Sequence, residues 1–374
     1  MSSLNASSPT PEGHGRLLPW IDSLPPYSPG KPAQAVYGLM PVKLSSNENP
    51  HPPLRSVIDA AIAALEDVNR YPDSLASGLV AEIAAQCQVQ PDNVAVGPGS
   101  VALLQQLIQI SSTVGDEVLC AWRSFEAYPL VTVLNGATPV TVPLTEHERH
   151  DLPEMARQLS QRTSVVLLCT PNNPPGTSIT TEEFRQFMQQ VPSDVLVVLD
   201  EAYAEFVRGE QYVDGLLEWS QFPNLAVLRT FSKAYGLAGL RVGYVIGHPD
   251  LVSGLRRSTV PFTVPAIAQA AAIESLRRRP ELLARVELIV AERTRVLERL
   301  LDLGLTVEPS QANFVWLRFG ERHQEFLDAC SNAALSVRPY GDEGVRVTIG
   351  EPEENDRFLD VAARFLSSAH GHCQ

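Results

Sequence analysis

One lysine in this sequence lies in a setting suited to chemistry at an amine. Of the 29 lysines and arginines in the chain, only Lys31, Lys43 and Lys233 are lysines. Because arginine stays protonated, chemistry that needs a neutral amine must use one of these three. Lys31 lies in a Pro/Gly-rich segment and Lys43 begins a short apolar run. Lys233 instead follows a strand pattern in TFSKAYGLAGLRVGY (230–244), where small neighbours leave space for a flat ligand.

A glycine-rich turn is a second candidate element, because it suits an anion. The turn GPGS (97–100) lies between the strand pattern NVAV and an apolar helix pattern. Its glycines let backbone N–H groups approach an anion, and a helix start favours negative charge. The turn also matches the G-x-G-x-x-A pattern of dinucleotide sites, which need an acid about 20 residues on. The next strand ends in Ala121 and Trp122, so the required acid is missing. An anion cradle and a plain tight turn remain as the two interpretations of this motif.

Further polar and aromatic side chains follow neighbouring strand patterns. Asp200 ends the apolar strand VLVVLD, where a carboxylate is costly unless it meets a cation or hydrogen-bond donors. Tyr203 lies three residues later, and Asn173 begins a rigid turn with two prolines. Phe125 lies just past another strand and can stack on a flat ligand. The ordinary alternatives are a helix cap for Asp200 and a core position for Phe125.

These groups converge if the strands are parallel, because ligands in open α/β sheets bind beyond the carboxyl ends of the strands. Ser232 and Arg241 then add a phosphate clamp beside Lys233. The set meets the needs of pyridoxal 5′-phosphate (PLP): a lysine for its aldehyde, a carboxylate for its pyridine nitrogen and a cradle for its phosphate. We therefore predict a PLP site at this edge of the sheet.

The element pattern predicts the sheet that would position these side chains. From about residue 75 to 260, helix patterns (among them 126–135) alternate with short apolar strands (among them 138–143), which favours an α/β fold with a mostly parallel sheet covered by helices. Helix patterns at 281–302, 321–333 and 352–367 then flank further strands and indicate a smaller α+β domain. We expect an N-terminal arm and first part of the small domain at 1–65, a large PLP-binding domain at 66–264, and a small C-terminal domain at 265–374.

The composition excludes several classes of partner. A net charge of −14 argues against nucleic acid and against an anionic membrane surface. The polar start MSSLNASSPTPEGHG does not resemble a secretory signal, and the apolar runs are too short to span a membrane. Five scattered cysteines show no metal spacing and favour a reduced, cytoplasmic protein without a metal site.

Over nearly the full chain, from about Leu24 to the last helix, the sequence resembles the fold-type-I PLP-dependent aminotransferases. Within them it is similar to the histidinol-phosphate aminotransferase group, and AWRSFEAYP with FSKAYGLAGLRVGY resembles the aromatic-amino-acid (phenylalanine) branch. The matching stretches are SSNENPHPP (45–53), RYPD (70–73), GPGS (97–100), PNNPPGT (171–177), DEAYAEF (200–206), TFSKAYGLAGLRVGY (230–244), QANFVWLR (311–318) and VRVTIG (345–350). Departures from the family pattern are Val101 and Ala102 after the glycine turn, Phe125 for a tyrosine, and Pro175 for a threonine.

The resemblance implies a role for each matching residue. Lys233 forms the Schiff base, Asp200 contacts the pyridine nitrogen, and Tyr203 contributes to catalysis. The other implied cofactor contacts are Asn173 and Tyr203 at the 3′-oxygen, Phe125 on the ring, and Gly99, Ser100, Val101, Ser232 and Arg241 at the phosphate. Tyr71 reaches the phosphate in a neighbouring subunit, which implies a homodimer with shared sites. The implied substrate contacts are Arg346 for the α-carboxylate, Arg338 for a second anion, and Asn47, Asn49 and Tyr27.

The expected function is PLP-dependent, ping-pong transfer of an amino group between a phenylalanine-like aromatic amino acid and 2-oxoglutarate. Two alternatives stay open: a histidinol-phosphate aminotransferase of histidine biosynthesis, and a related PLP decarboxylase. A PLP-sensing transcription regulator is excluded because no DNA-binding domain precedes the core. For Arg338, the alternative is a surface ion pair with Asp342 or Glu343, which would contribute little. The sequence does not decide the side-chain specificity, the preferred amino donor, the pathway or any assembly beyond a dimer.

Overall fold

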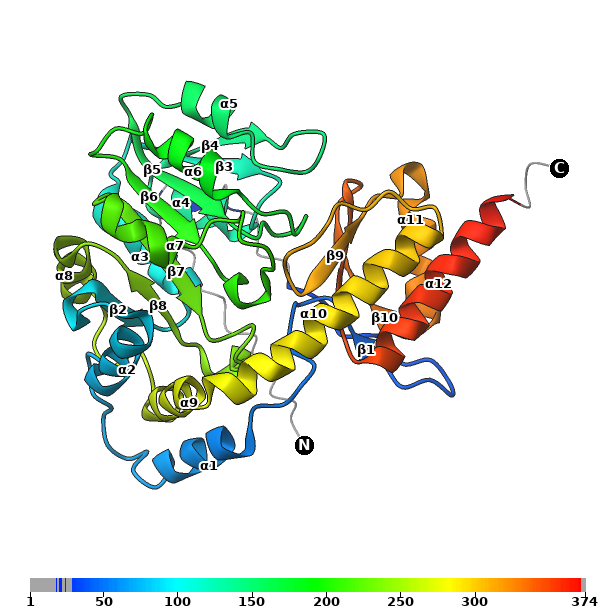
Figure 1. The fold of residues 1–374 in the computed structure, drawn as a ribbon, viewed down its shortest axis with the longest axis horizontal. Helices are drawn as coiled ribbons and strands as arrows, with labels where there is room; N and C mark the ends of the chain where they lie inside the picture. Colours follow the sequence, from blue (N-terminus) through cyan, green and yellow to red (C-terminus); the bar gives the residue numbers. More distant parts are fainter. Residues whose placement is uncertain (1–17, 19, 22–23, 25–28, 371–374) are drawn as a thin grey trace, which may run out of the picture.

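The protein folds into a large α/β part and a smaller part built around a long helix (Figure 1). The structure, a computed structural model, describes residues 18, 20–21, 24 and 29–370. Tyr27 therefore lies outside the described residues. Within the described part of the chain, no helix is long and apolar enough to cross a membrane.

The large part is built on a seven-stranded sheet of order β2-β8-β7-β6-β5-β3-β4. Five neighbouring strands, β7 to β4 in this order, are parallel, and β8 is antiparallel to both of its neighbours. The mostly parallel sheet predicted from the alternating pattern is therefore confirmed. The strands are β2 (Val94–Gly97), β3 (Glu117–Trp122), β4 (Thr138–Pro143), β5 (Thr163–Cys169), β6 (Leu196–Asp200), β7 (Leu225–Thr230) and β8 (Gly243–Ile246).

Helices cover both faces of this sheet, which is why its central strands are continuous apolar runs. Successive residues of a strand point to opposite faces. In β6, Val197 and Leu199 belong to one core cluster, whereas Leu196 and Val198 belong to the other. Residues of α2 (Ser77–Cys87), α5 (Leu152–Arg157), α6 (Thr181–Met188) and α9 (Ala266–Arg277) join the first cluster, and residues of α3 (Ser100–Ser111), α4 (Ala127–Leu134) and α8 (Pro249–Ser258) join the second.

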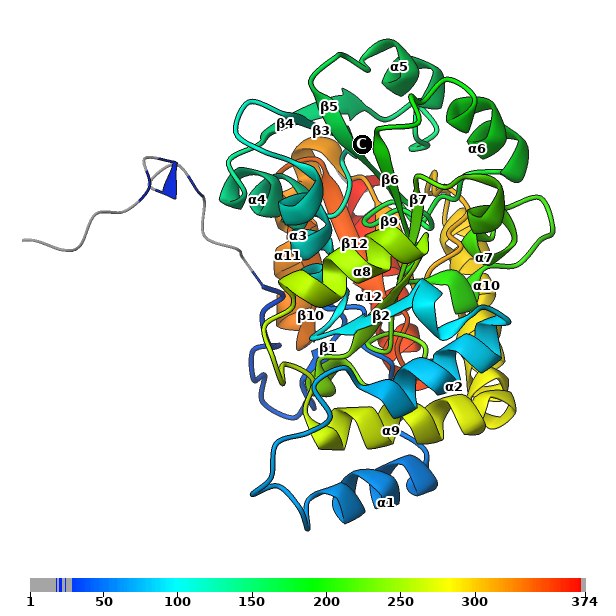
Figure 2. The same ribbon diagram turned by 90° about the vertical axis from the view of Figure 1, so that its left-hand side faces the viewer.

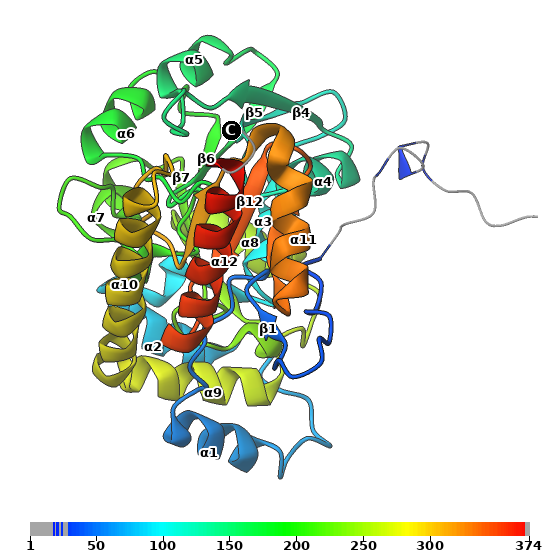
Figure 3. The same ribbon diagram turned by 90° about the vertical axis from the view of Figure 1, so that its right-hand side faces the viewer.

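The smaller part contains an antiparallel sheet of order β11-β12-β9. Its register places Arg338 directly opposite Arg346. Helices α10, α12 and α11 pack side by side over it (Figure 3). The elements are β9 (Phe314–Leu317), β11 (Arg338–Tyr340), β12 (Gly344–Thr348), α10 (Arg279–Asp302), α11 (His323–Asn332) and α12 (Pro352–His370).

The N-terminal segment joins both parts. Strand β1 (Val42–Lys43) pairs in parallel with β10 (Leu335–Ser336), and Thr348 N donates to Leu44 O. The chain then passes the carboxyl edge of the large sheet, where Asn47 contacts Tyr203. It next enters α1 (Arg55–Ala64), which packs on α9 (Figure 2). The predicted limits of the domains stay a prediction.

Two predicted elements differ in detail from the structure. The pattern at 321–333 divides into a 3₁₀ turn (Gly320–Arg322) and α11. The run LSVRPY divides into β10 and β11 because its two halves pair with different strands, β1 and β12. Sequence periodicity does not show such a change of partner, since both halves are extended.

Candidate active site

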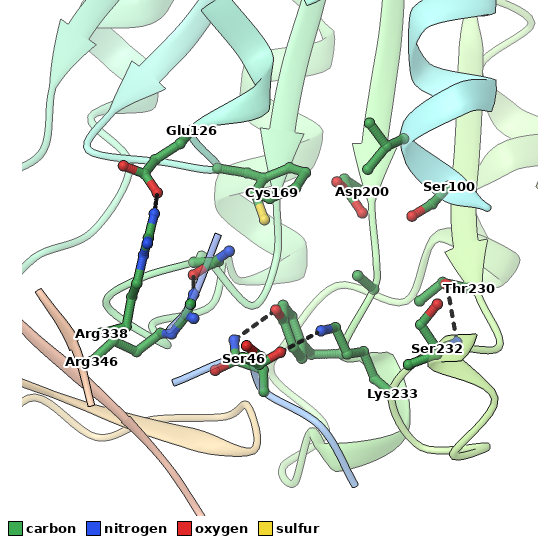
Figure 4. A pocket seen from close by; sticks show the side chains of 18 of the residues that line it. Ser46, Ser100, Glu126, Cys169, Asp200, Thr230, Ser232, Lys233, Arg338 and Arg346 are labelled. Atoms are coloured by element: carbon green, nitrogen blue, oxygen red, sulfur yellow. Dashed lines mark hydrogen bonds and ion pairs between the residues drawn. The ribbon is translucent and has the colours of Figure 1, made fainter. Parts of the chain in front are cut away.

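A pocket of about 240 Å³ lies at the carboxyl ends of β5, β6 and β7, between the large sheet and the small one. Figure 4 shows Asp200, Lys233 and Ser232 on the side of the large sheet, with Arg338 and Arg346 approaching from the smaller part. Val101 and Phe125 also line the pocket. The structure thus brings together side chains that the sequence places more than two hundred residues apart.

Lys233 is the pocket's amine. Burial, and then the positive charge of Arg346, lowers the pKa of Lys233 to about 7. Its Nζ donates to the carbonyl of Ser46 at 3.2 Å (Figure 4). A lysine with this pKa is partly neutral near pH 7 and can act as nucleophile or base.

Asn49 has a different position from the one expected. It is absent from the lining of the pocket. Its amide instead donates to the carbonyls of Lys233 (3.3 Å) and Ala234 (2.9 Å). In the structure this side chain fixes the backbone that carries the lysine, and a contact between Asn49 and the substrate stays a prediction.

Asp200 ends β6 and is buried, and desolvation raises its pKa to about 6. Its Oδ2 accepts a hydrogen bond of 2.9 Å from Tyr128 Oη, which opposes that rise. Its Oδ1 is buried and has no hydrogen-bond partner among the residues that the structure describes. Asp200 does not cap a helix, so this alternative from the sequence is wrong. Tyr128 was missed, although it lies in AWRSFEAYP, because the pattern does not show which way its ring points.

The glycine turn and the loop after β7 form an anion cradle. Gly99 has φ +92°, and a Cβ on it would lie 2.5 Å from Arg241 Nη2. Arg241 Nη1 also approaches Ser232 Oγ at 3.4 Å. Ser100 begins α3 and faces the same space (Figure 4). Free backbone N–H groups, a guanidinium and a hydroxyl suit a phosphate.

A hydrogen-bonded chain connects the small sheet to Asn173 and Tyr203. Arg346 Nη1 donates to Asn173 Oδ1 at 2.5 Å and to Tyr340 Oη at 2.7 Å. Arg346 Nε is buried and has no partner among the described residues. Asn47 Nδ2 donates to Tyr203 Oη at 2.9 Å. The guanidinium of Arg346 is thus held in place while one donor stays available for a ligand.

Arg338 makes an ion pair that the sequence did not indicate. Its Nη2 lies 2.7 Å from Glu126 Oε2, across the boundary between the two parts (Figure 4). Glu343 pairs instead with Arg123. The alternative of a surface pair with Asp342 or Glu343 is therefore wrong, because Arg338 is buried and turns toward the pocket.

Tyr71 lies outside this pocket. Its side chain is 82% exposed and its ring stacks on Phe262 at 4.6 Å. Within one chain Tyr71 does not line the pocket, and its contact with the cofactor of a neighbouring subunit stays a prediction.

PLP fits the residues present. The buried Asp200 Oδ1 lacks a donor, which a protonated pyridine nitrogen would supply. The close approach of Arg241 to the turn at Gly99 is possible because glycine has no Cβ, and it places a cation beside the helix start. Lys233 lines the same pocket as both. The fold and the site together define a PLP-dependent enzyme.

The chain belongs to the class I and II aminotransferases, whose family model matches residues 40–361. It is 52% identical over 350 residues to a protein of Streptomyces avermitilis named aromatic amino acid aminotransferase, covering 94% of this chain and 97% of that protein. A protein of the same name from Streptomyces coelicolor is 53% identical over the same shares. Histidinol-phosphate aminotransferase from Sinorhizobium meliloti, solved with pyridoxal-5′-phosphate, superposes with a TM-score of 0.85 at 27% identity, covering 96% of this chain and 99% of that one. The protein is therefore a PLP-dependent transaminase.

Proposed function

We propose that this enzyme transfers the amino group between an aromatic amino acid such as phenylalanine and 2-oxoglutarate, in two half-reactions of a ping-pong cycle. One observation carries the substrate assignment. The ring of Tyr340 lies 5.5 Å from the guanidinium carbon of Arg338 and 5.6 Å from that of Arg346. The same end of the pocket thus offers both an aromatic surface and two cations. The names of the relatives at 52% and 53% identity support the same choice.

PLP supplies an aldehyde that reacts with amines and a ring that takes up electrons. Lys233 would hold the aldehyde through its Nζ, and the same Nζ would remove the Cα proton of the substrate. Its lowered pKa suits that role, since an amine with a pKa of about 7 is partly neutral near pH 7 and can accept a proton. The same Nζ would then carry that proton for the second transfer.

The other residues bind and orient. Asp200 would keep the ring nitrogen protonated, and Tyr203 and Asn173 would bind the ring oxygen. Arg346 would bind the substrate α-carboxylate through its free Nε–H, while its Nη groups are held by Asn173, Tyr340 and Ser45, and this would fix the Cα–H bond relative to Lys233.

A panel of amino donors against 2-oxoglutarate tests this assignment. We expect phenylalanine to give a higher kcat/KM than histidinol phosphate. A large preference for histidinol phosphate would support the second candidate, which the Sinorhizobium meliloti structure favours. Release of CO₂ in place of the oxo acid would instead identify a decarboxylase.

Replacing Arg338 with alanine should raise the KM for 2-oxoglutarate strongly and the KM for phenylalanine little. Loss of a buried charged hydrogen bond costs roughly 2–5 kcal/mol, and each 1.4 kcal/mol is about tenfold in KM. Steady-state kinetics with each substrate varied measure both values. Arg123→Ala is the matched control, because it also breaks an ion pair between the two parts and does not line the pocket of about 240 Å³. Equal losses for the two substrates would make Arg338 structural.

We further propose a homodimer with shared sites, in which Tyr71 binds the cofactor phosphate of the neighbouring subunit. Its exposed ring supports this assembly. The enzyme is proposed to be cytoplasmic, because the four described cysteines are all free thiols.

Hybrid dimers test the shared site. Mixing an inactive Lys233→Ala protein with an inactive Tyr71→Ala protein should restore about a quarter of the wild-type activity, since half of randomly formed dimers are hybrids with one intact site. Activity is measured after subunit exchange, which mass spectrometry of differently tagged chains confirms. No recovery despite exchange would place Tyr71 in its own chain's site.

A further inference from the structure

The pocket contains a carboxylate that the proposed reaction does not use. Asp200 serves the ring nitrogen, whereas Glu126 has no role in the steps above. Glu126 belongs to the segment between β3 and α4 and reaches the pocket from the large part. The charged residues among the described lining are Glu126, Asp200, Lys233, Arg241, Arg338 and Arg346.

The carboxylate of Glu126 is directed at Arg338. Glu126 precedes the first residue of α4, but its side chain makes no capping hydrogen bond there. It instead lies 2.7 Å from Arg338 Nη2, with side-chain exposures of 28% for the glutamate and 9% for the arginine (Figure 4). The pair is therefore largely removed from water. Charge pairs in such an environment attract each other more strongly than pairs at the surface.

The register of the small sheet places this pair where a second carboxylate would go. Arg338 lies directly opposite Arg346 on the neighbouring strand, so both side chains share one face of the sheet. A substrate whose α-carboxylate binds Arg346 extends toward Arg338 if it carries a distal carboxylate. That carboxylate meets a guanidinium already bound to Glu126.

Resting on the proposed function, we propose that Glu126 sets the preference of the pocket between aromatic and dicarboxylate substrates. A dicarboxylate must displace Glu126 from Arg338 and come close to a like charge. An aromatic side chain leaves the ion pair intact, and the charge of Arg338 beside it is already balanced by Glu126. Glu126 thus weakens dicarboxylate binding and favours the aromatic substrate.

The structure provides space for the displaced carboxylate. Glu126, Arg338 and Tyr340 form a wall shared with a neighbouring cavity of about 500 Å³. Arg123 lines that second cavity. A glutamate released from Arg338 can therefore turn away from the substrate toward another cation.

A second ion pair provides a matched control. Arg123 and Glu343 join the same segment before α4 to the turn that follows β11. Neither residue lines the pocket of about 240 Å³. A variant of Glu343 therefore loses one contact between the two parts without changing the charge at the substrate.

The test measures binding of two unreactive acids to the PLP-loaded enzyme, as inhibition constants in the phenylalanine reaction. Glutarate has a distal carboxylate and 3-phenylpropionate has a phenyl ring. In Glu126→Gln, the ratio of the inhibition constant of 3-phenylpropionate to that of glutarate should rise about tenfold. This factor lies between the effects expected from losing an exposed charge pair and from losing a buried one. In Glu343→Gln the ratio should stay within about twofold of wild type.

An unchanged ratio in Glu126→Gln, or the same change in Glu343→Gln, overturns the inference. If Glu126→Gln does not fold, Glu126→Asp should shift the ratio in the same direction by a smaller factor, and no shift counts against the proposal. Failure of the wild-type enzyme to use phenylalanine would instead overturn the proposed function. The two failures are distinguishable, because binding of the acids can also be followed through the absorbance of the bound cofactor.

Discussion

Lys233→Ala should lose the covalent attachment of PLP and about 10⁴-fold or more of kcat, at the upper end of what acid–base groups contribute. Lys233 is the described lysine that lines the pocket, and its pKa of about 7 makes it both nucleophile and base. Borohydride reduction followed by peptide mapping should find the cofactor on the peptide that contains Lys233. Added small primary amines should restore part of the activity, because they replace the missing base.

Lys31→Ala and Lys43→Ala serve as controls for this experiment. Both side chains are exposed, and Lys43 is paired with Glu48. Each variant should retain the covalent link and near-native turnover. A cofactor-labelled peptide carrying either of these lysines would refute the assignment of Lys233.

Asp200→Asn should still bind PLP but lose roughly 10²- to 10⁴-fold in kcat, because removing one partner of a buried charge pair costs about 3–5 kcal/mol. The buried Oδ1 is the unpaired acceptor that a protonated ring nitrogen needs. An amide offers no negative charge there, so the ring takes up electrons less well. Single-turnover kinetics with phenylalanine measure the effect, and a near-native rate would contradict it.

Tyr128→Phe tests the same carboxylate through its hydrogen-bond donor. Its hydroxyl donates to Oδ2 and holds the pKa of the carboxyl down. Without it the pKa of Asp200 rises, so the carboxylate, which is the active form, is reached only at higher pH. The acidic limb of the kcat profile should move to higher pH, with activity near wild type above it. An unmoved limb would show that Tyr128 does not act through Asp200.

Much of the site could be predicted because its chemistry depends on residue type and on the ends of strands. Lys233, Asp200 and the turn at Gly99 each follow an apolar strand, and parallel strands bring their carboxyl ends to one edge. The helix boundaries could be placed to within a few residues, because the local periodicity of apolar residues determines them. The particular contacts of these residues with the cofactor stay predictions.

What could not be predicted depends on contacts between distant segments. Asn49 binds a backbone carbonyl 184 residues away, and Glu126 meets Arg338 across 212 residues. The sequence contains many other asparagines, glutamates and arginines, and residue type alone does not show which of them meet. Only the register of β11 on β12 and the packing of the two parts select them.

The path of the N-terminal segment has a consequence for how the protein is made. Asn47 bonds to Thr348, 301 residues later, and the preceding residue, Ser46, provides the carbonyl that accepts a hydrogen bond from Lys233. During synthesis, Ser46 and Lys233 leave the ribosome long before β12 exists. The large sheet can form from its own strands, but the wall that encloses the lysine forms only when the last strand arrives. We therefore expect the wall around Lys233 to be completed among the last events in the maturation of this chain.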